Sequence, residues 1–142
     1  MTISFDGKVC VVTGAGNGLG RCHALALAER GAKVVVNDLG GARDGTGASS
    51  EAADTVVDEI IKNGGEAFSH GANVTNYEEV VDMIKQTMKR WGRIDVLINN
   101  AGILRDKSFS KMELSDFKLV LDVHLMGSVN CTKAVWDIMK EQ

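Results

Sequence analysis

Residues 8–20 read KVCVVTGAGNGLG, a short apolar run that ends in a cluster of glycines. The run is rich in β-branched residues and predicts a buried strand, and residues 19–30 have the Ala- and Leu-rich spacing of a helix. A glycine-rich turn between them brings free backbone N–H groups and the positive end of the helix dipole together, which suits a pyrophosphate. We expect Gly14 to make the tight turn, Gly18 to admit the phosphate, and Gly20 to let the helix pack closely on the strand.

Strands and helices continue to alternate through the rest of the chain. Apolar runs predict further strands at residues 33–38, 67–72 and 93–98, and helical spacing predicts helices at 51–63, 76–91 and 115–139. A capping box of Thr75 and Glu78 is expected to open the second of these helices. The alternation predicts an α/β fold, a Rossmann-type doubly wound parallel sheet with strand order 3-2-1-4. We expect a single dinucleotide-binding domain over residues 1–142, with the remainder of the sheet missing.

Composition is that of an ordinary globular protein and excludes several classes of function. The 142 residues are 44% hydrophobic and 25% charged, with a formal net charge of -3. The sequence has no Lys/Arg cluster, no secretory signal and no apolar run of about 20 residues. We therefore expect no nucleic-acid partner, no membrane partner and a cytoplasmic location. Cys10, Cys22 and Cys131 lack CxxC spacing, which predicts buried apolar thiols and no metal site.

Asp38 ends the second predicted strand, about 20 residues past the glycine turn. A carboxylate at that point can accept both hydroxyls of an adenosine ribose and would repel a 2′-phosphate. The next residue is Leu39, where an arginine would be needed to pair with such a phosphate. Both observations favour NAD over NADP as the cofactor. The alternative is an aspartate that only caps the following loop.

Residues 13–20 fit the pattern TGxxxGxG, and Asn-Asn-Ala-Gly follows at residues 99–102, after the fourth predicted strand. Together these motifs resemble the short-chain dehydrogenase/reductase family. Methyltransferases share a glycine-rich first turn and an acid after the second strand. They have no counterpart of residues 99–102, so we reject them.

The resemblance narrows at residues 35–41, 103–106 and 123–125. These segments are similar to the (3R)-hydroxyacyl-CoA dehydrogenase branch, which includes a unit of the peroxisomal multifunctional β-oxidation enzymes and their bacterial relatives. The resemblance covers nearly the whole chain. It implies hydride transfer between NAD and an acyl thioester, a homo-oligomer when complete, and a peroxisomal location as the alternative for a eukaryotic protein. The rival group is the 3-oxoacyl-(acyl carrier protein) reductases, which usually prefer NADPH, and Asp38 argues against it.

The resemblance also implies a set of cofactor contacts spread along the chain. They fall on Gly14, Asn17, Gly18, Leu19, Gly20, Asp38, Asn73, Val74, Asn100 and Gly102. Most relatives have aspartate where Asn73 stands. Since asparagine can also donate and accept hydrogen bonds, we expect only the strength of the adenine contact to differ.

His124 stands where most of the family has a catalytic asparagine. An imidazole could hold the water of the proton relay, but the position also lies on a predicted apolar stripe with Leu121 and Ser128. We favour the interpretation of His124 as a hydrogen-bonded core histidine.

Five further polar residues have no clear role from the sequence. His23 and His70 lack evident partners and are expected to be structural or exposed. Arg21, Arg105 and Asp106 are expected either to face a ligand or to be solvated surface charges.

The catalytic tyrosine of the family, with a lysine four residues later and a serine upstream, has no counterpart in the chain. Tyr77 is the only tyrosine, Val81 stands four residues after it, and we interpret it as a packing residue. We expect the Ser/Tyr/Lys set beyond Gln142 and predict that this chain alone is inactive. A truncated enzyme, a non-catalytic NAD-binding module and a degenerate reading frame remain open. An incomplete sheet would also leave part of the long helix's apolar face bare.

Overall fold

The carboxyl ends of four parallel strands meet at one edge of the fold. The computed structural model describes residues 3–142, with strands β1 (Val9–Thr13), β2 (Lys33–Asn37), β3 (Glu66–His70) and β4 (Val96–Ile98). All strand pairs are parallel, and the order β3-β2-β1-β4 confirms the predicted sheet. The registers align Thr13 with Asn37 and Asn37 with His70, so the last residues of three neighbouring strands form a row.

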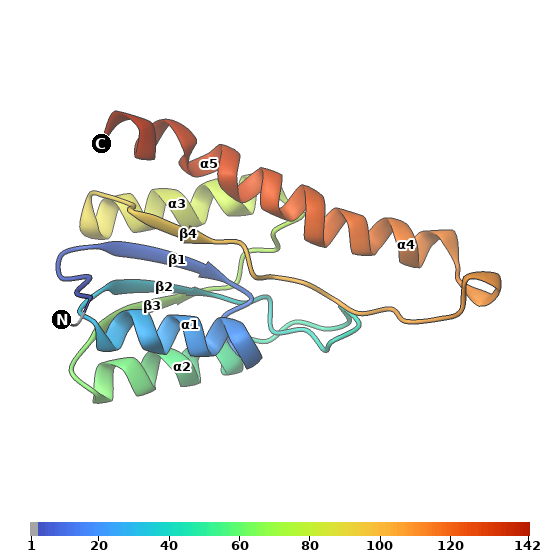
Figure 1. Cartoon of the computed structure of the whole chain (residues 1–142), viewed down its shortest axis with the longest axis horizontal. Helices are drawn as coiled ribbons and strands as arrows, with labels where there is room; N and C mark the ends of the chain where they lie inside the picture. Colours follow the sequence, from blue (N-terminus) through green and yellow to red (C-terminus); the bar gives the residue numbers. More distant parts are fainter. Residues whose placement is uncertain (1–2) are drawn as a thin grey trace.

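Helices cover both faces of this sheet, as Figure 1 shows. They are α1 (Gly18–Glu29), α2 (Glu51–Lys62), α3 (Tyr77–Trp91), α4 (Leu114–Leu121) and α5 (Gly127–Glu141). On one face, α1 and α2 pack against Val12, Val34 and Val36. On the other face, α3 and α5 pack against Val11 and Val35. These strands read as continuous apolar runs because both of their faces are buried.

The helix predicted over residues 115–139 is divided in the structure. Between α4 and α5 lies a π-helical segment, Asp122–Met126, and α4 extends beyond the edge of the sheet (Figure 1). Phe117 and Leu121 of the predicted buried stripe are exposed there, whereas Cys131 and Val135 of α5 are buried against the sheet. The bare apolar face expected for this helix is confirmed by further exposed side chains at Leu125, Val129 and Trp136.

The amino end of α3 differs from its prediction. Asn76, and not Thr75, caps the helix, because Asn76 Oδ1 accepts a hydrogen bond from the Glu78 backbone N–H at 3.1 Å. The Thr75 hydroxyl donates to Asn73 Oδ1 at 2.9 Å and is therefore engaged elsewhere. Tyr77 becomes the first helical residue, and its side chain is exposed. The Thr75–Glu78 capping box and the packing role of Tyr77 are thus wrong.

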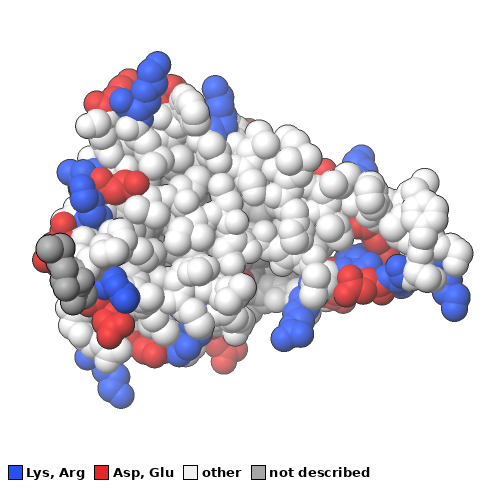
Figure 2. Space-filling model, in the orientation of Figure 1, with Lys and Arg blue, Asp and Glu red and all other residues white. Residues whose placement is uncertain are grey.

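The surface carries few features of other functional classes. Cys10 and Cys131 are buried as predicted, but Cys22 is exposed because its side of α1 faces away from the sheet. On the face shown in Figure 2, basic and acidic side chains are interspersed around the margin. Among residues 3–142, no group of three or more His, Cys, Asp or Glu side chains could hold a metal ion. In the same range, no helix is both long and apolar enough to cross a bilayer.

Candidate functional site

The glycine turn at the end of β1 has the backbone geometry that its sequence predicts. Gly14 has a φ of +63°, and a Cβ atom on it would lie 2.8 Å from the Ala101 Cα. A Cβ atom on Gly20 would lie 2.2 Å from the Gly14 carbonyl oxygen, so only glycine lets α1 approach β1 this closely. Gly18 has a φ of +54° and no atom within 4 Å of its Cβ position. The tight turn and the close packing are confirmed, and the phosphate contact of Gly18 stays a prediction.

The amino end of α1 has no side-chain cap. Asn17 is the N-cap residue, and its side chain makes no capping hydrogen bond to the first turn. The first N–H groups of any helix have no partner within the helix. They remain available to an anion at the glycine turn, where the helix dipole adds positive potential.

The Asn-Asn-Ala-Gly segment after β4 clamps the glycine turn. Asn100 Nδ2 donates to the carbonyl oxygens of Thr13 at 3.1 Å and Gly14 at 3.0 Å. In return, Thr13 Oγ1 accepts from the backbone N–H groups of Asn100 at 3.1 Å and Ala101 at 3.0 Å. The two motifs that carry the family resemblance are therefore one hydrogen-bonded unit. Sequence reasoning missed Thr13, whose only signal was its place between strand and turn.

Asp38 joins the glycine turn to the polar loop that follows β2. Its Oδ2 accepts from the Gly16 backbone N–H at 2.8 Å, and its Oδ1 accepts from the Gly40 N–H at 2.7 Å. A Cβ atom on Gly16 would lie 2.8 Å from Asp38 Oδ2, so the approach requires glycine. Each carboxylate oxygen keeps a second lone pair. The loop cap that we considered as the alternative is therefore present, and the ribose contact stays a prediction beside it.

A cleft of about 370 Å³ lies at the carboxyl edge of the sheet. Eight of the ten predicted cofactor residues line it, namely Gly14, Asn17, Gly18, Asp38, Asn73, Val74, Asn100 and Gly102. Leu19 and Gly20 do not line the cleft, because Leu19 faces solvent and Gly20 is buried beneath the turn. The sequence missed other lining residues, among them Asn37, Ala72, Arg43 and Ile103.

A larger hollow, about 850 Å³, lies at the opposite edge of the sheet and is lined in part by Asp6, Arg30 and Lys33. That edge holds the amino ends of the strands. In open α/β sheets, ligands bind outside the carboxyl ends of the strands. The cleft beside the glycine turn is therefore the candidate site despite its smaller volume.

The segment after β3 forms the cleft wall opposite the glycine turn. Asn73 Oδ1 accepts from the Thr75 backbone N–H at 3.0 Å and so closes a tight turn. Val74 is buried, and its carbonyl oxygen accepts from Asn130 Nδ2 of α5 at 2.9 Å. Since this segment is fixed by contacts from outside the cleft, it presents a defined wall to a ligand.

The polar loop between β2 and α2 reaches across the cleft to the segment that follows β4. The Leu104 backbone N–H donates to the Arg43 carbonyl oxygen at 2.7 Å, and Arg105 Nε donates to the Asp44 carbonyl oxygen at 2.7 Å. Arg105 also forms an ion pair with Asp116 of α4. The Arg105 side chain therefore links three segments of the chain.

Arg21 and His70 also have partners that the sequence did not reveal. Arg21 forms an ion pair with Glu59 of α2, so its guanidinium is directed away from the cleft. His70 bonds to Asp82 of α3, and the expectation that it lacks a partner is wrong. Both contacts join residues of different elements, which spacing along the chain does not show.

His124 lies in the π-helical segment beside the cleft. Its Nε2 is 3.1 Å from the Ile103 backbone nitrogen and 3.0 Å from the Ile103 carbonyl oxygen. The predicted hydrogen bonding is confirmed, but the core-histidine interpretation is wrong, because the side chain is exposed where the helix leaves the sheet. His124 faces a hollow of about 220 Å³ that Arg105 and Asp106 also line. π-Helical segments are frequent at functional sites.

The largest pKa shifts lie away from the cleft. Burial raises the pKa of the Cys10 and Cys131 thiols to about 11, so neither is a nucleophile at neutral pH. The Arg93 guanidinium lowers the pKa of Asp95 to about 2, at the amino edge of the sheet. These groups serve packing and stability, while the cleft itself is built from backbone N–H groups and one carboxylate.

Residues 8–142 match the family model described as short chain dehydrogenase. The chain belongs to the short-chain dehydrogenase family. It is 57% identical to peroxisomal multifunctional enzyme type 2 of Drosophila melanogaster, over 99% of this chain and 23% of that enzyme. It is 50% identical to a 3-oxoacyl-[acyl-carrier-protein] reductase of Synechocystis, over 95% of this chain and 51% of that reductase. This short-chain dehydrogenase chain thus spans between a quarter and a half of these two relatives.

Solved structures share the fold of this short-chain dehydrogenase chain. A 7α-hydroxysteroid dehydrogenase complexed with NADH and 7-oxo glycochenodeoxycholic acid superposes with a TM-score of 0.86 at 32% identity. The match covers 97% of this chain and 50% of that one. The Rossmann-type sheet predicted from the sequence is therefore the fold of the family.

Proposed function

We propose that this chain is the dinucleotide-binding domain of an NAD-dependent short-chain dehydrogenase that interconverts 3-hydroxyacyl and 3-oxoacyl thioesters. The observation that carries the proposal is the hydrogen-bonded unit of glycine turn, Asn100 and Asp38 around one cleft. The uncapped N–H groups of α1 suit the pyrophosphate, the Asp38 carboxylate suits the ribose hydroxyls, and the wall at Asn73 and Val74 suits the adenine. NAD bound there would accept or supply the hydride.

The choice of NAD follows from charge in the cleft. A 2′-phosphate on the adenosine ribose would approach the Asp38 carboxylate, and like charges in a partly desolvated cleft repel. Leu39 offers no cation to offset that repulsion. We expect NAD to bind at least tenfold more tightly than NADP, since each factor of ten corresponds to about 1.4 kcal/mol.

The thioester substrate is proposed from the relatives, whose names include a peroxisomal multifunctional enzyme and an acyl-carrier-protein reductase. For the complete protein we propose a small acyl thioester substrate, a homo-oligomer, and a peroxisomal location if the source is eukaryotic. A second candidate is an NADP-dependent 3-oxoacyl reductase. It is favoured by Arg43, a cation on the cleft wall that could receive a 2′-phosphate.

Calorimetric titration of the 142-residue chain with NAD and with NADP tests the proposal. Two glycines give a matched pair of variants, because Gly18 and Gly92 both have positive φ and no atom within 4 Å of the Cβ position. Alanine at either position costs roughly 1–2 kcal/mol of backbone strain. Only Gly18→Ala is expected to weaken NAD binding, since only Gly18 lies at the cleft. Equal NAD affinities in the two variants would contradict the site, and tighter NADP binding by the unmodified chain would favour the second candidate.

A further inference from the structure

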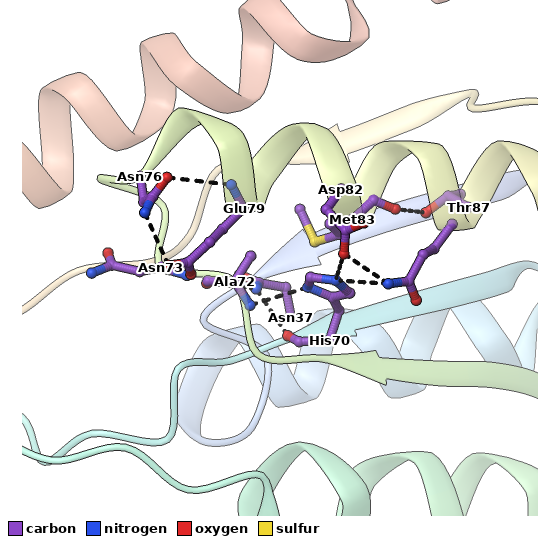
Figure 3. Close-up of polar contacts among 10 residues, drawn as sticks. Asn37, His70, Ala72, Asn73, Asn76, Glu79, Asp82, Met83 and Thr87 are labelled. Atoms are coloured by element: carbon purple, nitrogen blue, oxygen red, sulfur yellow. Dashed lines mark hydrogen bonds and ion pairs between the residues drawn. The ribbon is translucent and has the colours of Figure 1, made fainter.

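His70 connects α3 to the cleft wall through both nitrogens of its ring, as Figure 3 shows. The Ala72 backbone N–H donates to His70 Nδ1 at 3.1 Å. On the other side of the ring, His70 Nε2 lies 3.1 Å from Asp82 Oδ2 of α3. The His70 side chain is only 13% exposed, so these contacts are largely shielded from water.

These partners permit only one tautomer of the neutral ring. A backbone N–H can only donate, so His70 Nδ1 must present its lone pair to Ala72. The ring proton then resides on Nε2, which donates to the Asp82 carboxylate. Gln86 Nε2 donates to the same Asp82 oxygen at 2.8 Å and so holds the carboxylate in place. Accepting these bonds lowers the pKa of Asp82, with the His70 contact as the largest cause.

Ala72 is held from two directions at the point where the chain enters the cleft wall. Its N–H is bonded to the His70 ring, and its carbonyl oxygen accepts from Asn37 Nδ2 at 3.0 Å. The same Asn37 Nδ2 donates to the His70 carbonyl oxygen at 3.0 Å. Ala72, Asn73 and Val74 then line the cleft in succession. The direction in which this wall leaves β3 is therefore set by one side chain of β2 and one ring of β3.

We propose that His70 is a positioning residue for nucleotide binding, which fixes the Ala72–Val74 wall against the adenine half of the cofactor. The inference rests on the proposed function, because it concerns the affinity of the same cleft. His70 touches neither the cleft nor the ligand. It acts by joining the wall to Asp82 of α3, whose position is set by the buried helix face packed on the sheet.

Two conservative substitutions separate the two sides of the ring. In His70→Asn, the side-chain oxygen replaces Nδ1 and can still accept from the Ala72 N–H. In His70→Gln, the amide reaches the position of Nε2 and can still donate to Asp82, but nothing accepts from Ala72. We expect His70→Asn to keep its affinity for ADP-ribose within twofold, and His70→Gln to weaken it at least fivefold. A loss that followed thermal stability alone would not separate the two variants in this way.

Calorimetry with two half-ligands, ADP-ribose and nicotinamide mononucleotide, locates the effect. The affinity for nicotinamide mononucleotide should be equal in the three proteins, because the wall faces the adenine half. Nitrogen-15 spectra of the histidines should show His70 Nδ1 without a proton in the unmodified chain. Equal ADP-ribose affinities for the two variants, or a proton on Nδ1, would overturn the role of His70 alone. Failure of the unmodified, folded chain to bind ADP-ribose or NAD would overturn the proposed function and this role with it.

Discussion

Replacing Asp38 with asparagine should weaken both the fold and the choice of cofactor. The carboxylate accepts two backbone N–H bonds, from Gly16 at 2.8 Å and from Gly40 at 2.7 Å. Hydrogen bonds to a charged group contribute about 1.5–3 kcal/mol each, and neutral ones contribute about 1 kcal/mol. In Asp38→Asn, the amide NH₂ would face one of these N–H groups, so one bond is lost and the other becomes neutral.

The expected loss of stability follows from these contributions. Asp38 is partly exposed, so the lower value for each charged bond applies, and the free energy of unfolding should fall by about 2 kcal/mol. Urea unfolding of the chain without nucleotide measures this loss as a lower midpoint at an unchanged slope. Asp58→Asn, on the exposed side of α2, removes the same charge and should change the unfolding free energy by less than about 0.5 kcal/mol.

Cofactor binding gives a second, independent measurement on the same variant. Asp38→Asn should weaken NAD binding about tenfold through the lost ribose bonds, and should weaken NADP binding less because the repulsion of the 2′-phosphate is gone. The ratio of the two affinities should therefore approach one. An unchanged ratio would show that Asp38 does not contact the ribose. An unchanged unfolding midpoint would show that its two backbone bonds do not stabilise the fold.

Three further predictions concern other parts of the chain. Arg93 lowers the pKa of Asp95 from 3.8 to about 2, so the stability due to this pair, about 2 kcal/mol, should be complete above pH 5. It should be lost as the pH falls through 2, and Asp95→Asn should abolish that part of the acid dependence of urea unfolding. The 142-residue chain should form no NADH from a 3-hydroxyacyl-CoA above a heat-killed control, because it contains no Tyr-x-x-x-Lys. His124→Asn should lower the free energy of unfolding by about 1 kcal/mol through the lost Ile103 bond and leave NAD affinity within twofold by calorimetry.

The strand order and most of the cleft could be predicted because their signals are local. A buried strand, a glycine turn and a helix start each leave a pattern within a dozen residues. The predicted residues Gly14, Asp38 and Asn100 come together because the carboxyl ends of parallel strands share one edge. Topology thus turned several local predictions into one site.

The errors concern contacts whose direction the sequence does not contain. Spacing suggested Thr75 as the cap of α3, but the turn at Asn73 takes its hydroxyl and leaves Asn76 to cap. His70 and Asp82 meet only because β3 and α3 pack side by side. The polar loop at residues 40–50 has no hydrophobic period, so its path across the cleft to Leu104 could not be predicted either.

The row formed by Thr13, Asn37 and His70 explains why the cleft walls are fixed without a ligand. These residues end three neighbouring strands in register, where the chains diverge and ladder hydrogen bonds stop. Each residue uses its side chain to bond the backbone of a segment that lines the cleft: Thr13 bonds Ala101, and Asn37 and His70 bond Ala72. Buried backbone groups must be paired, and at this edge only side chains can pair them. The polar residues at the strand ends therefore replace the interrupted ladder, and the order they impose on the loops gives the cleft its shape.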